Sequence, residues 1–117
     1  MTTQEILEAA RAAKTAVALS DGATRNAALC GMADALGAPE HLDAILAANA
    51  EDMSAAKGKI SDVMLDRLAL TPQRIAAMAK GIRDVAALPD PVGRVLSRIQ
   101  RPNGLLIEKT AVPMGVI

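Results

Sequence analysis

The chain has 117 residues and a mass of 12.1 kDa, which is the size of one small domain. Its 13 Lys and Arg balance its 13 Asp and Glu, whereas a protein that binds nucleic acid or an anionic membrane needs a basic excess. The absence of Phe, Tyr and Trp excludes base stacking and aromatic cages, and one Cys with one His excludes a disulfide framework and a closed zinc site. Because the sequence contains no membrane-length apolar run and no signal-peptide pattern, it predicts a soluble, cytoplasmic chain.

Five amphipathic helices are predicted over residues 1–88, which hold every alanine except Ala111. Start and stop signals predict the first three helices over Thr2 to Asp21-Gly22, about Thr24 to Leu36, and Pro39 to about Lys57. The fourth helix is expected to start at Ser61 and the fifth at Thr71-Pro72. The inward-facing residues are expected to be Ile6, Ala10, Ala13 and Val17; Leu29, Met32 and Leu36; Leu42, Ile45, Leu46 and Met53; Met64, Leu65 and Leu68; and Ile75, Met78, Ala79, Ile82 and Val85.

A β-hairpin is predicted within residues 89–117, where the apolar period shortens toward two. Pro102-Asn103-Gly104 is typical of a tight turn, and the return strand is expected over Leu105 to Val112. The two faces of the first strand should carry Val95, Ser97 and Ile99 on one side, and Leu96, Arg98 and Gln100 on the other.

The last residues, 112–117, are apolar and β-prone, a pattern more typical of the start of a buried strand than of an exposed terminus. We therefore expect the chain to be the front of a longer protein.

Several sequence blocks, spread from about Ile6 to Ile117, resemble the glutamate-5-semialdehyde dehydrogenases, also called γ-glutamyl phosphate reductases, of the aldehyde dehydrogenase superfamily. The blocks with the most specific match are residues 85–93 and 101–105. The others are Met32-Ala33-Asp34-Ala35-Leu36, Ile45-Leu46-Ala47-Ala48-Asn49-Ala50, Met64-Leu65-Asp66-Arg67-Leu68, Leu70-Thr71-Pro72 with Arg74-Ile75, and Val112-Pro113 with Gly115-Val116-Ile117.

The resemblance implies that this chain is the N-terminal piece of an NADPH-dependent enzyme. Such an enzyme reduces L-glutamyl 5-phosphate to L-glutamate 5-semialdehyde in proline biosynthesis, through a thioester on a cysteine that lies further along the chain. It further implies an α/β (Rossmann) parent fold, in which residues 1–88 form a helical segment and residues 89–117 form a hairpin and enter the first strand of an NADP-binding domain. The parent enzyme is expected to be a cytoplasmic homo-oligomer, whose hairpin joins an antiparallel extension used for oligomerisation. The piece itself is expected to be inactive and not to bind NADP tightly.

No catalytic, cofactor-binding or metal-binding residue is assigned within these 117 residues. Cys30 is expected to be a small buried helix residue, and His41 a solvent-facing residue in the first turn of a helix. No Gly-x-Gly-x-x-Gly or Walker-type loop occurs, and one His offers no convincing catalytic triad.

A modest basic cluster accompanies the hairpin, with Arg94, Arg98, Arg101 and Lys109 against the single acid Glu108. It could meet a phosphate of the substrate or of NADP, but charges that protect a strand edge are the favoured interpretation. The methionines 32, 53, 64 and 78 are expected to fill the core of an aromatic-free chain.

One alternative function stays open, namely a self-sufficient helical module without enzymatic activity that binds a partner helix on its Ala- and Met-lined faces. Cooperative melting of a folded monomer would favour this module, whereas a molten or aggregating chain would favour the truncated enzyme.

Overall fold

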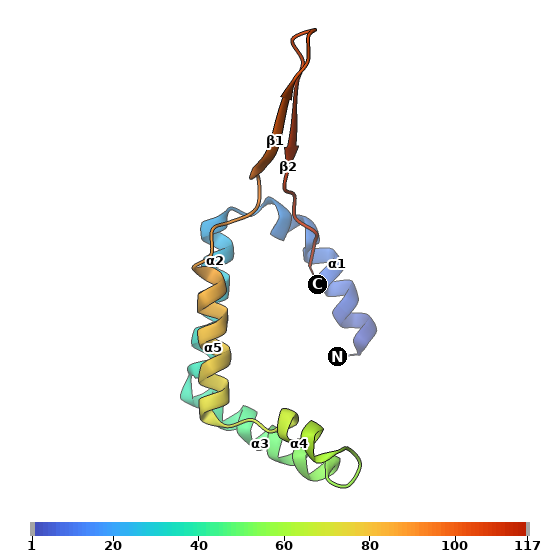
Figure 1. Cartoon of the computed structure of the whole chain (residues 1–117). Helices are drawn as coiled ribbons and strands as arrows, with labels where there is room; N and C mark the ends of the chain where they lie inside the picture. Colours follow the sequence, from blue (N-terminus) through green and yellow to red (C-terminus); the bar gives the residue numbers. More distant parts are fainter. Residues whose placement is uncertain (1, 117) are drawn as a thin grey trace. The chain divides into compact units, whose positions relative to one another are not determined.

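Five helices followed by a two-stranded antiparallel hairpin make up the described part of the chain (Figure 1), as predicted. The structure is a computed structural model that describes residues 2–116. Its elements are α1 (Thr3–Leu19), α2 (Gly22–Gly37), α3 (Pro39–Ala56), α4 (Asp62–Leu68), α5 (Pro72–Ala86), β1 (Val95–Gln100) and β2 (Leu106–Thr110).

The chain forms two compact units. The terminal unit consists of Met1–Arg25 with Pro89–Ile117, and the helical unit is Asn26–Leu88. Helix α2 begins in the terminal unit and continues through the first part of the helical unit. The predicted assignment of residues 89–117 to the entry of a further domain concerns a longer protein and stays a prediction.

The start of α1 is fixed by the predicted capping box. The Thr2 hydroxyl accepts a hydrogen bond from the Glu5 backbone N–H at 3.3 Å, and the Glu5 carboxylate accepts one from the Thr2 N–H at 2.7 Å. Two N–H groups that have no partner inside the helix are thereby satisfied. The apolar stripe of α1 is present but not buried, because Ile6, Ala13 and Val17 are exposed and Ala10 is only half-buried.

The boundary between α1 and α2 differs from the predicted one. Asp21-Gly22 was expected to end the first helix, but α1 ends at Leu19 and Gly22 already begins α2. The cause is local, since the Asp21 carboxylate accepts a hydrogen bond from the Thr24 N–H at 2.7 Å and so caps α2. Hydrogen bonds from the side chain and backbone of Thr24 hold the pKa of Asp21 below its ordinary value.

An ion pair joins the two stretches of chain that border the helical unit. Arg25 Nη2 lies 2.5 Å from Asp90 Oδ2, and Arg25 Nη1 also donates to the Ser20 carbonyl that follows α1. A Cβ on Gly22 would lie 2.6 Å from the same Asp90 oxygen, so a larger residue there would displace the Asp90 carboxylate. The backbone N–H of Val92 and the Arg25 guanidinium hold the pKa of Asp90 below its ordinary value.

The hairpin follows the predicted turn but contains one irregularity. Gly104 adopts a φ of +83° in the turn, and Asn103 Oδ1 accepts from the Leu105 N–H at 3.1 Å. Val95 pairs with Thr110 and Ser97 pairs with Lys109, so Leu96 is an extra residue on β1. This bulge interrupts the strict alternation that was predicted from Val95 onward, and the regular register begins at Ser97.

The segment after β2 has no regular secondary structure from Ala111 to Val116. Ala111 nevertheless continues the pairing, because it donates to the Arg94 carbonyl and accepts from the Gly93 N–H, each at 3.0 Å. Gly115 has a φ of +105°, and the aliphatic stem of Lys14 from α1 lies beside it.

In the helical unit the predicted starts of three helices are confirmed. Pro39 and Pro72 occupy the first turns of α3 and α5, and the Ser61 and Thr71 hydroxyls cap α4 and α5. The fully buried apolar residues of the described chain are Ala33, Ile75 and Ala79. An ion pair joins α5 to α2, because Arg83 Nη2 lies 2.5 Å from Asp34 Oδ1.

The corner between α4 and α5 is held by two polar side chains. Asn49, 8% exposed on α3, donates to the Leu68 carbonyl at 2.9 Å and accepts from the Leu70 N–H at 2.8 Å. Arg74 of α5 donates to the backbone carbonyls of Asp66 and Ala69. The backbone groups left over where α4 ends therefore find partners on the two neighbouring helices.

Burial follows the predicted stripes only in part. Leu42, Ile45, Leu46, Met53, Leu65 and Leu68 are half-buried as expected, whereas Met32, Met64, Met78 and Val85 are exposed. Each of these four lies on the flank of its helix stripe, where the described chain provides no covering element. Among the described residues no helix combines the length and the apolar character that crossing a membrane would require.

Asn49→Ala should lower the free energy of unfolding by about 1–3 kcal/mol, because it leaves a backbone donor and acceptor without partners. Urea unfolding followed by circular dichroism measures this change. Asn26→Ala, at an exposed position on α2, is the matched control and should shift the value by less than about 0.5 kcal/mol. Equal effects of the two substitutions would contradict the role given to Asn49.

Asp90→Asn should lower the free energy of unfolding at neutral pH. The difference from the unsubstituted protein should become smaller as the pH falls. Because folding lowers the pKa of Asp90, its contribution is present above the unfolded value of about 3.9 and is lost as the pH falls through the folded value. Urea titrations at several pH values between 7 and 3 measure the difference from the unsubstituted protein. Asp52→Asn, on α3, serves as the control; a difference that persists unchanged in acid would refute the linkage.

Candidate functional site

Cys30 lies exposed on α2, so the expectation that it is buried was wrong. The buried stripe of α2 runs through Leu29, Ala33 and Leu36. At 100° per residue, Cys30 is turned about a quarter of the circumference away from that stripe. The helix was predicted correctly, but the Cys30 thiol lies on its exposed side and not on its buried side.

His41 occupies the first turn of α3 and is exposed, as predicted. Its Nδ1 lies 2.9 Å from the carbonyl oxygen of Ala35, near the end of α2. Since a carbonyl only accepts, Nδ1 carries the proton and supplies a partner to one of the last carbonyls of α2. Across residues 2–116 no three His, Cys, Asp or Glu side chains come together as a metal site.

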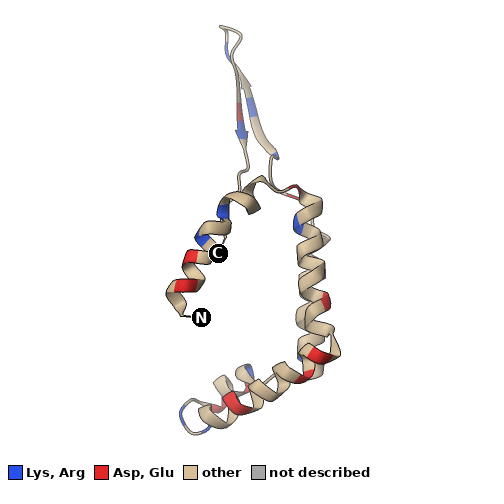
Figure 2. Cartoon of the chain, turned by 180° about the vertical axis from the view of Figure 1, so that it is seen from behind, with Lys and Arg blue, Asp and Glu red and all other residues tan. Residues whose placement is uncertain are grey.

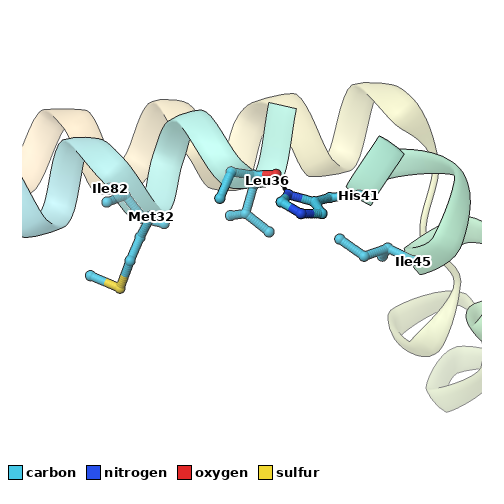
Figure 3. A pocket seen from close by; sticks show the side chains of 6 residues that line it. Met32, Leu36, His41, Ile45 and Ile82 are labelled. Atoms are coloured by element: carbon cyan, nitrogen blue, oxygen red, sulfur yellow. Dashed lines mark hydrogen bonds between the residues drawn. The ribbon is translucent and has the colours of Figure 1, made fainter. Parts of the chain in front are cut away.

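An open apolar groove lies beside His41 in the helical unit (Figure 3). It has a volume of about 390 Å³. Its lining comes from three helices and consists of Met32, Ala35 and Leu36 of α2, His41 and Ile45 of α3, and Ile82 of α5. The groove is not predictable from the sequence, although Met32, Leu36, Ile45 and Ile82 were expected on apolar faces. The helical period does not indicate where the apolar faces of α2, α3 and α5 separate and leave a groove between them.

The predicted basic cluster lies along the hairpin, where both signs of charge are present (Figure 2). Arg98 and Glu108 are directly opposite in the ladder, and Arg98 Nε donates to Glu108 Oε1 at 2.7 Å. This cross-strand pair engages the guanidinium that was considered for phosphate binding. Arg94, Arg101 and Lys109 are exposed.

The described residues offer no cradle for the phosphates of a dinucleotide. Gly31 and Gly81 lie within helices, while Gly58, Gly93 and Gly104 each adopt a positive φ in separate turns. A dinucleotide site needs several glycines in one loop at a helix N-terminus. Residues 2–116 therefore contain no glycine-rich phosphate loop of this kind, and the expected lack of catalytic and cofactor-binding residues in this chain stays a prediction.

Comparison with known proteins identifies relatives that share one name. No family model matches the chain. The chain is 59% identical over 109 residues to a gamma-glutamyl phosphate reductase of Rhodospirillum rubrum, a match that covers 92% of this chain and 25% of the relative. A gamma-glutamyl phosphate reductase of Streptococcus pneumoniae is 56% identical over 114 residues, covering 97% of this chain and 27% of the relative.

A solved structure agrees with these relatives. The crystal structure of the gamma-glutamyl phosphate reductase of Thermotoga maritima superposes with a TM-score of 0.80 at 33% identity, covering 93% of this chain and 27% of that one. The resemblance predicted from the sequence is thus confirmed. The chain spans about a quarter of the length of the relatives that it matches.

Proposed function

We propose that this chain is the N-terminal quarter of a γ-glutamyl phosphate reductase, because it resembles those enzymes over nearly all of its own length. The observation that carries the proposal is 59% identity across 92% of the chain, together with a TM-score of 0.80 to a solved reductase. Identity at this level over a full set of helices and a hairpin favours common ancestry with shared function over a shared fold alone.

The proposed reaction converts L-glutamyl 5-phosphate, NADPH and a proton into L-glutamate 5-semialdehyde, NADP⁺ and inorganic phosphate. Hydride from the nicotinamide replaces the phosphate on the acyl carbon, so the substrate is reduced and the cofactor oxidised. In this proposal the nucleophile and the NADP-binding Rossmann domain lie in the remaining three quarters of the enzyme. The present chain supplies packing surfaces, and by itself it is expected to be inactive and to bind NADP weakly.

The whole reductase is expected to act in the cytoplasm, in proline biosynthesis, and to be a homo-oligomer. The hairpin supports self-association because every residue of its two strands is exposed and Ile99 lies opposite Ile107. A two-stranded hairpin of this kind is stable only beside more sheet or a helical layer.

The direct test is a reductase assay on the full-length protein, run in the easier reverse direction. Purified protein with NADP⁺, phosphate and glutamate 5-semialdehyde should produce NADPH, followed by absorbance at 340 nm. An antibody raised against residues 1–117 should detect a native product about four times larger than 12.1 kDa. A product of 12.1 kDa without activity would instead favour the partner-binding module.

Cys30→Ser in the full-length reductase should leave turnover within about twofold of the unsubstituted enzyme, because residues 26–34 around Cys30 include no His or Lys that could activate its thiol. Steady-state kinetics test this, with circular dichroism as the control for folding. A loss of several orders of magnitude in a folded variant would make Cys30 the nucleophile and overturn the assignment.

Arg98→Gln should leave the Michaelis constants of both substrates nearly unchanged, since the Arg98 guanidinium is engaged by Glu108 on the hairpin. The exposed pair contributes at most about 1 kcal/mol to stability. Arg101→Gln, at the hairpin turn, is the matched control. A tenfold rise of either Michaelis constant for Arg98→Gln alone would restore the phosphate-binding interpretation.

A further inference from the structure

The turn between β1 and β2 contains the one Asn-Gly sequence of the chain, Asn103-Gly104, and both residues are exposed (Figure 1). An asparagine in this position has a reactive neighbour, because the next backbone nitrogen can attack its side-chain amide carbon. Glycine has no Cβ that would hinder the approach. The other two asparagines, Asn26 and Asn49, precede alanines.

Two hydrogen bonds of the turn act on the reacting groups. Asn103 Oδ1 accepts from the Leu105 N–H at 3.1 Å. This donor stabilises the negative charge that the amide oxygen gains when its carbon is attacked. The Gly104 N–H donates to the Arg101 carbonyl at 2.9 Å, so the attacking nitrogen is free only when that bond opens. The turn therefore activates the amide and restrains its attacker.

We propose that Asn103 is a site of spontaneous deamidation in this protein. The Gly104 nitrogen forms a bond to Asn103 Cγ and gives up its proton, the Cγ–Nδ2 bond breaks, and ammonia leaves with that proton. Water then opens the resulting succinimide ring. Attack of water at Cγ gives an aspartate, and attack at the backbone carbonyl carbon gives a β-linked aspartate. The reaction consumes one water and releases one ammonia, with no oxidation or reduction.

The other two asparagines lie where this reaction is blocked. Asn49 is 8% exposed, and its amide bonds to the Leu68 carbonyl at 2.9 Å and the Leu70 N–H at 2.8 Å. Asn26 is exposed but lies within α2, where the next backbone N–H is directed at a carbonyl of the preceding turn. In addition, the Cβ of the following alanine hinders the approach at both positions.

Asp21-Gly22 could close the same ring by losing water instead of ammonia. Its carboxylate accepts from the Thr24 N–H at 2.7 Å and caps α2. Hydrogen bonds from the side chain and backbone of Thr24 also hold the pKa of Asp21 below its ordinary value. The group is therefore ionised at neutral pH, and a carboxylate anion repels the electron pair of an attacking nitrogen. The reaction is thereby confined to the hairpin turn.

The two products change the hairpin differently. An aspartate at position 103 adds one negative charge beside Arg101 and still accepts from the Leu105 N–H. The β-linked product adds a methylene to the main chain between residues 103 and 104. It is incompatible with the present turn, in which the Arg101 N–H donates to the Leu105 carbonyl at 2.8 Å. Deamidation therefore alters both the charge and the shape of the exposed hairpin tip.

The first experiment incubates the full-length protein in mildly alkaline heavy-oxygen water, where base helps to remove the Gly104 proton. Digestion and mass spectrometry then measure each position. Conversion at Asn103 should be at least about tenfold faster than at Asn26 or Asn49, since only Asn103 precedes a residue without a Cβ. A β-linked product is diagnostic, because simple hydrolysis leaves the main chain intact. No conversion at Asn103, equal conversion at Asn26, or the absence of a β-linked product would each overturn the proposal.

The second experiment tests the ring and the turn separately. Asn103→Gln adds a methylene, which disfavours ring closure, and should abolish ammonia release at this position, whereas the control Asn26→Gln should leave conversion of Asn103 unchanged. In urea the unsubstituted protein should react roughly two- to tenfold faster, the factor that corresponds to losing one backbone hydrogen bond. Equal or slower reaction in urea, or continued release from Asn103→Gln, would contradict the proposal.

This inference does not depend on the proposed function. If Asn103 is converted and no NADPH is formed in the reductase assay, deamidation stands and the proposed function fails. If NADPH is formed and Asn103 stays intact, the proposed function stands and deamidation fails.

Discussion

Side-chain amide and guanidinium groups hold the helical unit in shape, because apolar burial inside it is scarce. Only Ala33, Ile75 and Ala79 are fully buried apolar residues in the described chain. Asn49 bonds to backbone on both sides of Ala69, and Arg74 binds the last carbonyls of α4. A seven-residue helix such as α4 is not stable alone, so its position depends on these bonds.

Helix ends were predictable from the sequence because capping is local. Thr2, Ser61 and Thr71 bond to N–H groups three residues ahead, and the information needed lies within one turn. The same locality explains the error at Asp21. That residue could end one helix or cap the next, and only the spacing to Thr24, once folded, selects the second. The turn at Asn103-Gly104 was equally local and was predicted correctly.

Burial was predicted less well, because it depends on what lies beside each stripe. The helical period identifies an apolar face but not which part of that face a neighbour covers. Met32 and Val85 were expected inside and lie exposed, whereas Ile75 and Ala79, at the centre of the α5 stripe, are buried. The bulge at Leu96 could not be predicted from the sequence either, because strand register is set by the pairing partner. The groove was not predicted because it depends on which elements lie beside each helix stripe.

The distribution of polar and apolar groups indicates what kind of role this chain can have. Its ion pairs and capping bonds are used internally, to close helix ends and to join Arg25 to Asp90 and Arg98 to Glu108. Its exposed surface also carries large apolar side chains on α2, α5 and the hairpin, such as Met32, Met78 and Ile99. A site that performs chemistry shows the opposite arrangement, with polar groups left over for a ligand. Under the proposed function, a chain built in this way would contribute packing surfaces to the reductase rather than single catalytic residues.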